Sequence, residues 1–230
     1  MGGDKKKSLQ LKVKYMVDKF LAVIGLLLLM PVFLVVSVVL KLMGYRVFYL
    51  QKRVGENGRD FYLYKFTTMP EGSEKLGFIT TANDQRPFGF GRFLRKMKIN
   101  EIPQLINVLN GTMSFVGPRP LIREQLKEVF SEEEIREYYR MRPGITGAGS
   151  LWYHHEDVLL AQVSDPYKFY RKVVMPRKME LERAYAEKWS LWLDAKILLM
   201  TLLVLSVSRV GVIDSKNLFY RCFEKVFREF

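Results

Sequence analysis

Cationic side chains and one carboxylate gather ahead of a short amphipathic segment near the middle of the chain. The cations are Arg92, Arg95, Lys96 and Lys98, and Asn100 and Glu101 follow them. A helix that begins at Asn100 would place its positive end beside these cations, and together they favour binding of a phosphate group. Glu101 has the ligand type that a divalent metal prefers in phosphoryl chemistry, although it could equally serve only to complement the helix dipole. The segment therefore predicts a phosphate site with a carboxylate in it.

Two proline- and glycine-rich segments further along carry additional arginines. Arg119 lies between Pro118 and Pro120, and the segment RPGITG contains Arg142, Gly144 and Gly147. A guanidinium on a stiff backbone suits bidentate recognition of phosphate, and glycines let backbone N–H groups approach one. Prolines also simply stiffen loops, and a short glycine motif is a weak signal. Both segments are candidate phosphate-binding loops, with a purely structural role as the alternative.

The composition limits the kinds of partner and site. Lys and Arg outnumber Asp and Glu by 37 to 24, which gives a net charge of +13. Such a charge favours an anionic partner: nucleic acid, anionic lipid or a phosphorylated substrate. Nucleic acid is disfavoured, because the basic residues cluster beside a strongly apolar segment and no recognised nucleic-acid motif occurs. The single cysteine, Cys222, excludes an internal disulfide, and with only His154 and His155 to join it a zinc site is disfavoured too.

The apolar segment extends over residues 20–40 and contains no charged side chain. This is about the length that a helix needs to cross a bilayer, and it is too long, with no cleavage site after it, for a signal peptide. Pro31 in its middle removes a helix hydrogen bond, and both flanks are basic, so the charges give no clear orientation. We expect a re-entrant helix that enters and leaves on one side; a kinked spanning helix is the alternative.

The region after this segment predicts a small, α-rich α/β domain. Two segments rich in β-branched and aromatic residues, VFYLQKRVG and RDFYLYKFTTM, flank a Gly/Asn turn and predict a β-hairpin. A helix is expected from Asn100, acting as its N-cap, to Leu109, and an extended loop for TMSFVGPRPL. Residues 123–139 are helical by periodicity, with Ser131 as a cap, and RPGITG is expected to be a loop.

The C-terminal part is expected to be helical. Apolar residues recur at helical spacing over residues 167–189, and Pro176 divides this region into two predicted helices. Residues 197–207 are too short to cross a membrane and indicate a core or interfacial helix. Basic and aromatic residues alternate in the tail, residues 211–230, as is typical of segments in the headgroup layer of a membrane. A solvated helical end is the alternative for this tail.

Several ordered motifs carry a resemblance to a known family. They are KYMVDKFLA, the proline-broken helix, QKRVG, YKFTTM, ITTANDQRPFGFGRFLRK, NEIPQLINVLNGTMSFVGPRP, RPGITG and WSLWLDAKILLMT. Over residues 14–201 the chain resembles the bacterial sugar transferases, the monotopic polyprenyl-phosphate phosphoglycosyl transferases. The resemblance implies a re-entrant membrane anchor, Mg²⁺ as cofactor, and transfer of a sugar phosphate from a UDP-sugar to a polyprenol phosphate with release of UMP.

The resemblance also implies which residues form the site. The family's catalytic Asp-Glu pair falls at Asn100 and Glu101, with Glu101 as metal ligand and Arg95 and Arg119 as catalytic cations. The implied substrate-binding residues are Arg92, Lys65, Pro118, Pro120, Arg142, Gly144 and Gly147, and those implied for the membrane element are Lys14, Asp18 and Pro31.

The same resemblance implies an arrangement at the bacterial inner membrane. A basic arm and membrane helix, residues 1–44, would anchor a small catalytic domain, residues 45–210, that faces the cytoplasm and is followed by the tail, residues 211–230. Amphipathic helices would lie at the membrane interface. A second copy of the chain, forming a homodimer, is a further candidate partner.

Asn100 departs from the family pattern, in which an Asp at this position attacks the β-phosphate of the donor. A neutral amide is not a competent nucleophile for that step. Three explanations remain open: an inactivating substitution, a natural branch that reacts by direct displacement, and a non-catalytic membrane-bound binding or scaffold protein. The retained Arg95, Glu101 and Arg119 favour the first two. Phosphoryl transfer depends mainly on positioning and charge neutralisation, so direct displacement is chemically feasible. Further departures, at Thr67 and in AGSLWYHHED, concern the choice of sugar.

Overall fold

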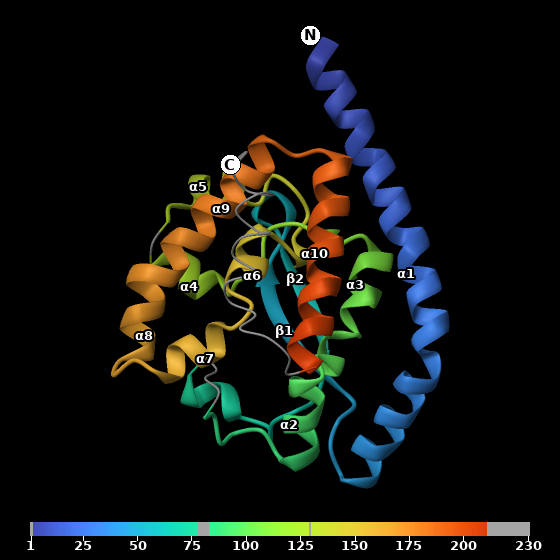
Figure 1. Ribbon diagram of the computed structural model, residues 1–230, viewed down its shortest axis with the longest axis vertical. Coiled ribbons are helices and arrows are strands. Elements are labelled where there is room, and N and C mark those ends of the chain that lie inside the picture. Colours follow the sequence, from blue (N-terminus) through green and yellow to red (C-terminus); the bar gives the residue numbers. More distant parts are fainter. Residues whose placement is uncertain (1, 78–82, 129, 211–230) are drawn as a thin grey trace.

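The computed structural model of the protein describes residues 2–77, 83–128 and 130–210. Helices pack around two small two-stranded sheets, and one long helix lies along the whole length of the molecule (Figure 1). The predicted α-rich α/β architecture is therefore confirmed. The predicted interfacial tail, residues 211–230, lies outside the described residues.

The long helix, α1 (Gly2–Leu42), contains the whole apolar segment and continues through Pro31. Figure 1 shows it bending in its C-terminal part, as a proline inside a helix causes by removing a hydrogen bond and displacing a carbonyl. Its inner side is buried against the domain at Ala22, Val36 and Leu40, whereas its outer side exposes large apolar residues along its length. One helix therefore supplies both a part of the protein core and a long apolar surface.

The predicted hairpin is confirmed by β1 (Phe48–Val54) and β2 (Asp60–Phe66), which pair antiparallel with Phe48 opposite Phe66. The turn between them has positive φ at Asn57 and Gly58, as the Gly/Asn cluster predicts. Phe66 packs with Val36, Leu40 and Leu94, so the hairpin is joined to the C-terminal part of α1.

A second sheet lies in two segments that the sequence predicted to be loops. β3 (Ser114–Val116) pairs parallel with β4 (Gly144–Thr146). Gly117 and Gly144 make this pairing possible, since a Cβ on Gly117 would lie 2.3 Å from the Arg142 carbonyl oxygen. The loop predictions were wrong here because strands of three residues are too short to show an alternating pattern.

The helices around the candidate phosphate site are α2 (Gly89–Lys96) and α3 (Gln104–Asn110). The prediction that Asn100 caps the latter was wrong: Asn100 lies in a short helical turn, Ile99–Glu101, and α3 starts only after Pro103. Pro103 explains the break, because proline lacks the N–H that a continuous helix needs and restricts the residue before it. The predicted end at Asn110-Gly111 is confirmed, with Gly111 at φ 78°.

The region predicted as one helix over residues 123–139 forms two, α4 (Arg123–Lys127) and α5 (Glu132–Tyr138). Ser131 begins the second helix with a capping box, in which its hydroxyl accepts from the Glu134 N–H and the Glu134 carboxylate accepts from the Ser131 N–H. The cap at Ser131 was predicted, but the start of a separate helix at this residue was not. The short helices α6 (Ala148–Trp152) and α7 (Glu156–Ala161) follow β4.

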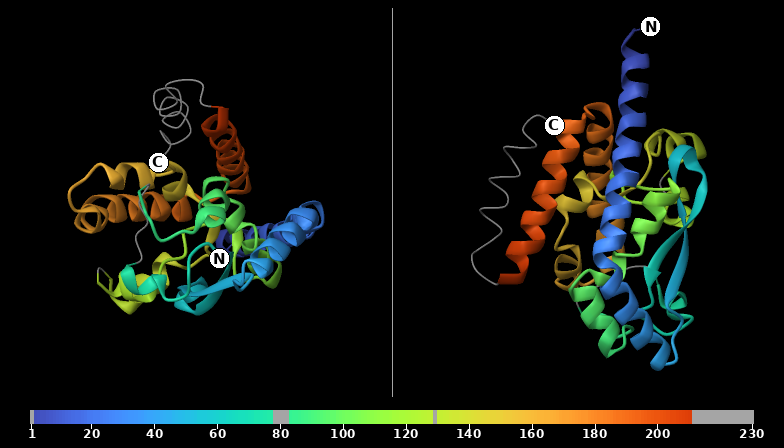
Figure 2. Two further views of the ribbon diagram at one scale, coloured as in Figure 1. Left: turned by 90° about the horizontal axis from the view of Figure 1, so that it is seen from below. Right: turned by 90° about the vertical axis from the view of Figure 1, so that its right-hand side faces the viewer.

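The C-terminal part consists of α8 (Pro166–Phe169), a π-helical turn (Tyr170–Val174), α9 (Met175–Glu187) and α10 (Leu191–Val210). The predicted division at Pro176 is wrong in detail, because the backbone stays helical from α8 into α9 and the wider turn precedes the proline. Figure 2 shows α10 beside the body of the molecule, on the side away from β1 and β2. Its inner residues Ile197, Met200 and Val204 belong to the main core cluster, whereas Trp192 is 70% exposed.

Candidate active site

Glu101 is the centre of a group of charged side chains that come from separate parts of the sequence. Its Oε1 lies 3.5 Å from Lys65 Nζ, on β2, and 3.8 Å from Arg119 Nη2, in the loop after β3. The Arg119 side chain is 41% exposed, whereas those of Lys65 and Glu101 are only 18% and 21% exposed. The three groups therefore form a partly enclosed site, in which Arg119 has the largest accessible surface.

The electrostatics of this site favour an anionic ligand. Burial alone would raise the pKa of Glu101, but Lys65, Arg119 and Lys98 together lower it to about 2, so the carboxylate is ionised at neutral pH. Burial lowers the pKa of Lys65 to about 8, against the opposing effect of Glu101. Cations that are crowded together with one carboxylate still carry excess positive charge, and a phosphate would neutralise it.

Asn100 precedes Glu101 in the same short turn and is only 6% exposed. Its side-chain oxygen Oδ1 is buried without a hydrogen-bond partner among the described residues. A buried amide oxygen without a partner costs free energy of roughly 1–3 kcal/mol, and such atoms often belong to sites that bind a ligand or an ion. The position at which the sequence resemblance led us to expect a nucleophile thus holds an unsatisfied polar group, as a ligand site would.

The loop that carries Arg119 is held by contacts to its backbone. The Tyr139 hydroxyl donates to the Arg119 carbonyl oxygen at 2.9 Å and accepts from the Leu121 N–H at 3.0 Å. Arg53 Nη1 donates to the Pro120 carbonyl oxygen at 3.2 Å. These bonds satisfy backbone groups next to proline, which has no N–H of its own, and they leave the Arg119 side chain available.

Arg95 is also brought toward the site, whereas Arg92 is not. Both are on α2, but Arg92 is exposed, and Arg95 is partly buried. Burial lowers the pKa of Arg95, while Asp84 and Glu101 oppose this, so its guanidinium is within electrostatic reach of the central carboxylate. Leu94, next to Arg95 on α2, is fully buried.

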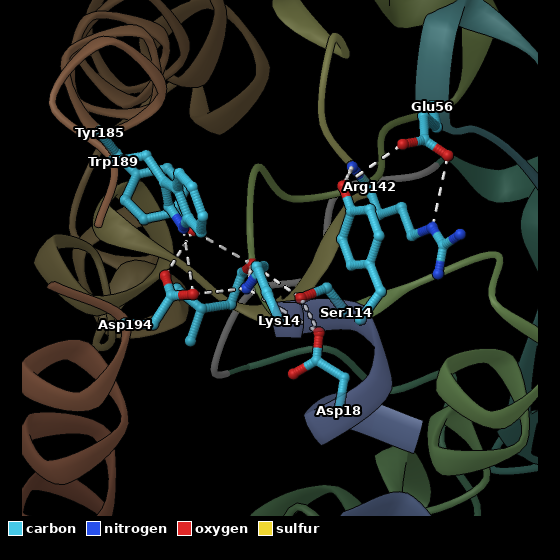
Figure 3. Close-up of polar contacts among 10 residues, drawn as sticks. Lys14, Asp18, Glu56, Ser114, Arg142, Tyr185, Trp189 and Asp194 are labelled. Atoms are coloured by element: carbon cyan, nitrogen blue, oxygen red, sulfur yellow. Dashed lines mark hydrogen bonds and ion pairs between the residues drawn. The ribbon is translucent and has the colours of Figure 1, made fainter. Parts of the chain in front are cut away.

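The residues of the RPGITG segment have other contacts. The Arg142 guanidinium stacks on the Tyr15 ring, with its carbon 3.8 Å from the ring centroid, and its Nε donates to Glu56 at 3.3 Å (Figure 3). The Gly144 N–H donates to the Pro118 carbonyl oxygen at 3.0 Å. A Cβ on Gly147 would lie 2.3 Å from the Gly117 carbonyl oxygen, so that glycine is needed for close packing. Their predicted part in substrate binding stays a prediction.

Lys14 and Asp18, which were predicted to belong to the membrane element, are buried inside the protein at 3% and 7% exposure. Lys14 Nζ donates to Asp194 Oδ2, on α10, at 2.6 Å and to the Val116 carbonyl oxygen at 3.0 Å (Figure 3). Asp18 accepts from the Ser114 hydroxyl at 2.6 Å. Their observed contacts therefore join α1 to β3 and α10.

Sequence reasoning missed three residues that shape the site: Arg53, Tyr139 and Glu182. Arg53 stands in the QKRVG motif, which could have drawn attention to it. Glu182, only 2% exposed, accepts a 2.9 Å bond from the Gly149 N–H and so caps the start of α6, where Gly147 offers no side chain. Burial raises the pKa of Glu182 to about 8. Nothing local in the sequence indicates a cap that comes from a helix 33 residues away.

The comparison with protein families decides the assignment of the chain. Residues 9–208 match the model of the family described as bacterial sugar transferase. The chain belongs to the bacterial sugar transferase family. The resemblance found in the ordered sequence motifs is thereby confirmed.

Three relatives show what is known within this sugar transferase family. The UDP-glucose:undecaprenyl-phosphate glucose-1-phosphate transferase of Xanthomonas campestris pv. campestris is 35% identical over 207 residues, which are 87% of this chain and 40% of that protein. The exopolysaccharide production protein ExoY of Sinorhizobium fredii is 32% identical over 209 residues, 84% of each chain. The UDP-N-acetylgalactosamine-undecaprenyl-phosphate N-acetylgalactosaminephosphotransferase of Aeromonas hydrophila is 35% identical over 195 residues, 83% of this chain and 43% of that protein. The chain therefore spans less than half of two of these relatives.

Proposed function

We propose that this sugar transferase moves a sugar 1-phosphate from a UDP-sugar to a polyprenol phosphate, undecaprenyl phosphate in bacteria, and releases UMP. The observation that carries the proposal is the partly enclosed group of Glu101, Lys65 and Arg119 beside the unsatisfied Asn100. It offers cations for a diphosphate and one ionised carboxylate. Two of the three relatives are named as transferases of sugar phosphates to undecaprenyl phosphate, and the third as an exopolysaccharide production protein. We infer a first membrane step of exopolysaccharide or another glycoconjugate.

The proposed location is the cytoplasmic face of the bacterial inner membrane, with α1 inserted from that face. Among the described residues, α1 is the helix long and apolar enough to cross a membrane, over Lys7–Leu42. Yet its apolar part packs on the domain at both ends: Ala22 with Leu63 and Val108, and Leu40 with Phe66. A helix that crossed the bilayer would carry these domain surfaces into lipid, where polar groups are costly. The proline inside α1 and the basic flanks support a re-entrant insertion instead.

The proposed reaction is a direct displacement. A phosphate oxygen of the polyprenol phosphate attacks the β-phosphorus of the UDP-sugar, and the bond from that phosphorus to the oxygen of the α-phosphate breaks. The products are UMP and a polyprenol diphosphate sugar. Arg119 and Lys65 would bind the phosphate oxygens and neutralise the charge that develops, which is where most of the catalysis of phosphoryl transfer arises. Asn100 would position the phosphoryl group through its amide, because it cannot act as the nucleophile.

A divalent metal fits this group of residues in a limited sense. Mg²⁺ is usually held by one or two carboxylates together with substrate phosphates and water. Glu101 supplies one ionised carboxylate, and Asn100 supplies an amide oxygen that has no partner among the described residues. The described residues hold no group of three or more His, Cys, Asp and Glu side chains, so most ligands would come from the substrate. We propose that Glu101 would hold Mg²⁺, whose positive charge would offset that of the phosphate groups.

Asn100 also favours a second candidate function, a membrane-bound protein that binds the donor or the lipid phosphate without turnover. The two candidates are separated by UMP release from a panel of UDP-sugars with Mg²⁺ and undecaprenyl phosphate, for the unaltered chain and for Asn100→Asp. Lipid-dependent release by the unaltered chain supports direct displacement. Release only by the Asp form shows that Asn100 interrupts a covalent mechanism, and silence of both forms contradicts the proposed transfer.

Two further substitutions test the site itself. Arg119→Ala and Glu101→Gln are expected to abolish UMP release and to leave attachment to membranes intact, because neither residue lies on α1. Arg123→Ala, which removes ion pairs with Asp60 and Glu132, is the matched control for Arg119. Turnover that persists in either variant would remove that residue from the site.

A further inference from the structure

The loop that carries Arg119 packs on a core cluster that extends to α7 and α9. Tyr139, which donates to the Arg119 carbonyl oxygen, lies in this cluster with Leu121 and Tyr170. Glu156 is the first residue of α7 and contacts Lys178, on α9, through its Oε2. Lys178 in turn lies over the ring of Tyr170, so this ion pair, which the proposed reaction does not use, borders the cluster that supports the Arg119 loop.

This ion pair is held by aromatic residues. Lys178 Nζ lies 5.7 Å from the ring centroid of Tyr153 and 5.6 Å from that of Tyr170, distances at which an ammonium is attracted to an aromatic face. Lys178 is only 9% exposed, whereas the Glu156 side chain is 26% exposed. The ammonium is thus enclosed, and the carboxylate that it orients keeps an accessible edge.

A buried ion pair is a weak source of stability. The cost of removing both charges from water offsets most of their attraction, and a well-packed apolar pair of similar volume is often as stable. The pair stands out further because another ion pair on α9, Arg177 with Glu180, is exposed on both side chains. A charge pair of this kind, next to the cluster that supports the loop of a proposed substrate-binding cation, is a candidate for recognition of a polar ligand.

The segment from Tyr153 to Asp157 lies within electrostatic reach of cations of the site. Asp157 is among the charges that act on Arg95, and Lys98 is among those that act on His154. A sugar 1-phosphate has its ring joined directly to the phosphate. If Arg119 and Lys65 bind that phosphate, the sugar ring must lie within a few bond lengths of them. The segment from Tyr153 to Asp157 could then contact the ring. It also belongs to the stretch AGSLWYHHED, where the sequence departs from the family pattern.

We propose that Glu156, oriented by Lys178, accepts hydrogen bonds from hydroxyl groups of the donor's sugar and so determines which UDP-sugar is used. This rests on the proposed function, because it assigns the sugar subsite of the same active site. A carboxylate can accept from two neighbouring hydroxyls at once, and bonds to a charged acceptor are about twice as strong as neutral ones. A sugar whose hydroxyl points elsewhere would leave that carboxylate unpaired, and a site that binds a hydroxyl discriminates strongly against such an analogue.

The test is titration calorimetry of the full-length protein in detergent with UDP, UDP-glucose, UDP-galactose and their two N-acetylated amino-sugar counterparts. For each sugar, the ratio of the Kd for UDP to the Kd for the UDP-sugar isolates the contribution of the sugar. Glu156→Gln is expected to lower this ratio for the preferred sugar about tenfold, the effect of one charge-assisted hydrogen bond, with no change in the Kd for UDP. Lys178→Met should act in the same direction, since it frees the carboxylate from its partner.

Glu180→Gln and Arg177→Met are the matched controls, because they break the exposed ion pair of the same helix, and both should leave all ratios unchanged. A Glu156→Gln protein that keeps the ratios of the controls overturns the proposal, as does one that loses affinity for UDP and for UDP-sugars equally. A wild-type protein that binds UDP-sugars no better than UDP overturns it as well. Absence of binding to UDP and to every UDP-sugar would instead contradict the proposed function, and the sugar subsite with it.

Discussion

Replacing Lys14 with Met is expected to destabilise the protein strongly, although the residue is far from Glu101 in sequence. Lys14 Nζ lies 2.6 Å from Asp194 Oδ2, and the two residues are 3% and 7% exposed. Met keeps a similar length and an apolar stem but removes the charge. The carboxylate of Asp194 would then stay buried without a cation.

The magnitude follows from the contacts that Asp194 retains. Loss of one partner of a buried ion pair costs about 3–5 kcal/mol, because the other charge is left uncompensated. Asp194 still accepts from the Tyr185 hydroxyl at 2.6 Å and from Trp189 Nε1 at 3.1 Å, so the lower end, about 3 kcal/mol, is the expected value. Adding Asp194→Asn removes one of the two carboxylates beside Lys14 Nζ, the other being Asp18 at 3.9 Å, and should restore part of the loss, which a double-mutant cycle measures as coupling.

The assay is urea unfolding of the detergent-solubilised protein, followed by tryptophan fluorescence, since Trp189 contacts Asp194 directly. With a slope of about 1–3 kcal/mol per molar urea, a loss of about 3 kcal/mol lowers the midpoint by about 1 M or more. Lys12→Met, two residues away on an exposed part of α1, is the control. If the Lys14→Met protein unfolds at the midpoint of the control, the buried pair does not stabilise the fold and the reasoning is refuted.

Two further predictions concern the site and the second sheet. The kcat/KM for the donor should fall as pH rises through about 8, because the pKa of Lys65 is lowered to about 8 and only its protonated form binds phosphate. Lys65→Arg should move this fall to higher pH, whereas the control Lys52→Arg, on an exposed side chain, should not. Identical pH profiles of the two variants would show that Lys65 does not cause the fall. Gly117→Ala should lower the free energy of unfolding by about 1–3 kcal/mol or more, because its Cβ would lie 2.3 Å from a backbone oxygen, whereas the control Gly89→Ala, with nothing within 4 Å, should not. Thermal unfolding compares the two variants, and equal melting temperatures would contradict the packing role of Gly117.

The parts of the fold that the sequence predicted are those decided by local chemistry. The hairpin turn needs positive φ, which Asn57 and Gly58 adopt, and the α3 end needs the left-handed conformation of Gly111. The capping box at Ser131 is equally local. The sheet of β3 and β4 was not predicted, because it pairs residues 114–116 with residues 144–146. No pattern within either segment indicates that the other is its partner.

In the candidate site, too, the residues that lie in local motifs were predicted, and those that act through distant contacts were not. Glu101, Arg119 and Lys65 stand in motifs of recognisable type, and the structure brings them together. Asn100 was predicted to cap a helix, which was wrong because Pro103 delays the start of that helix. Tyr139 could not be found from sequence, since it acts through a carbonyl group of a loop about twenty residues away and not through any motif of its own.

The pairing of Lys14 with Asp194 also has a consequence for biosynthesis. The two residues are 180 positions apart, so Asp194 is synthesised long after Lys14. At about 5–20 residues per second, translation separates them by roughly 10–40 s. During that interval the ammonium of Lys14 lacks its final partner, while the apolar remainder of α1 is already able to enter lipid. Membrane attachment would thus precede completion of the core, and the last helix of the described chain would lock an anchor that is already in place.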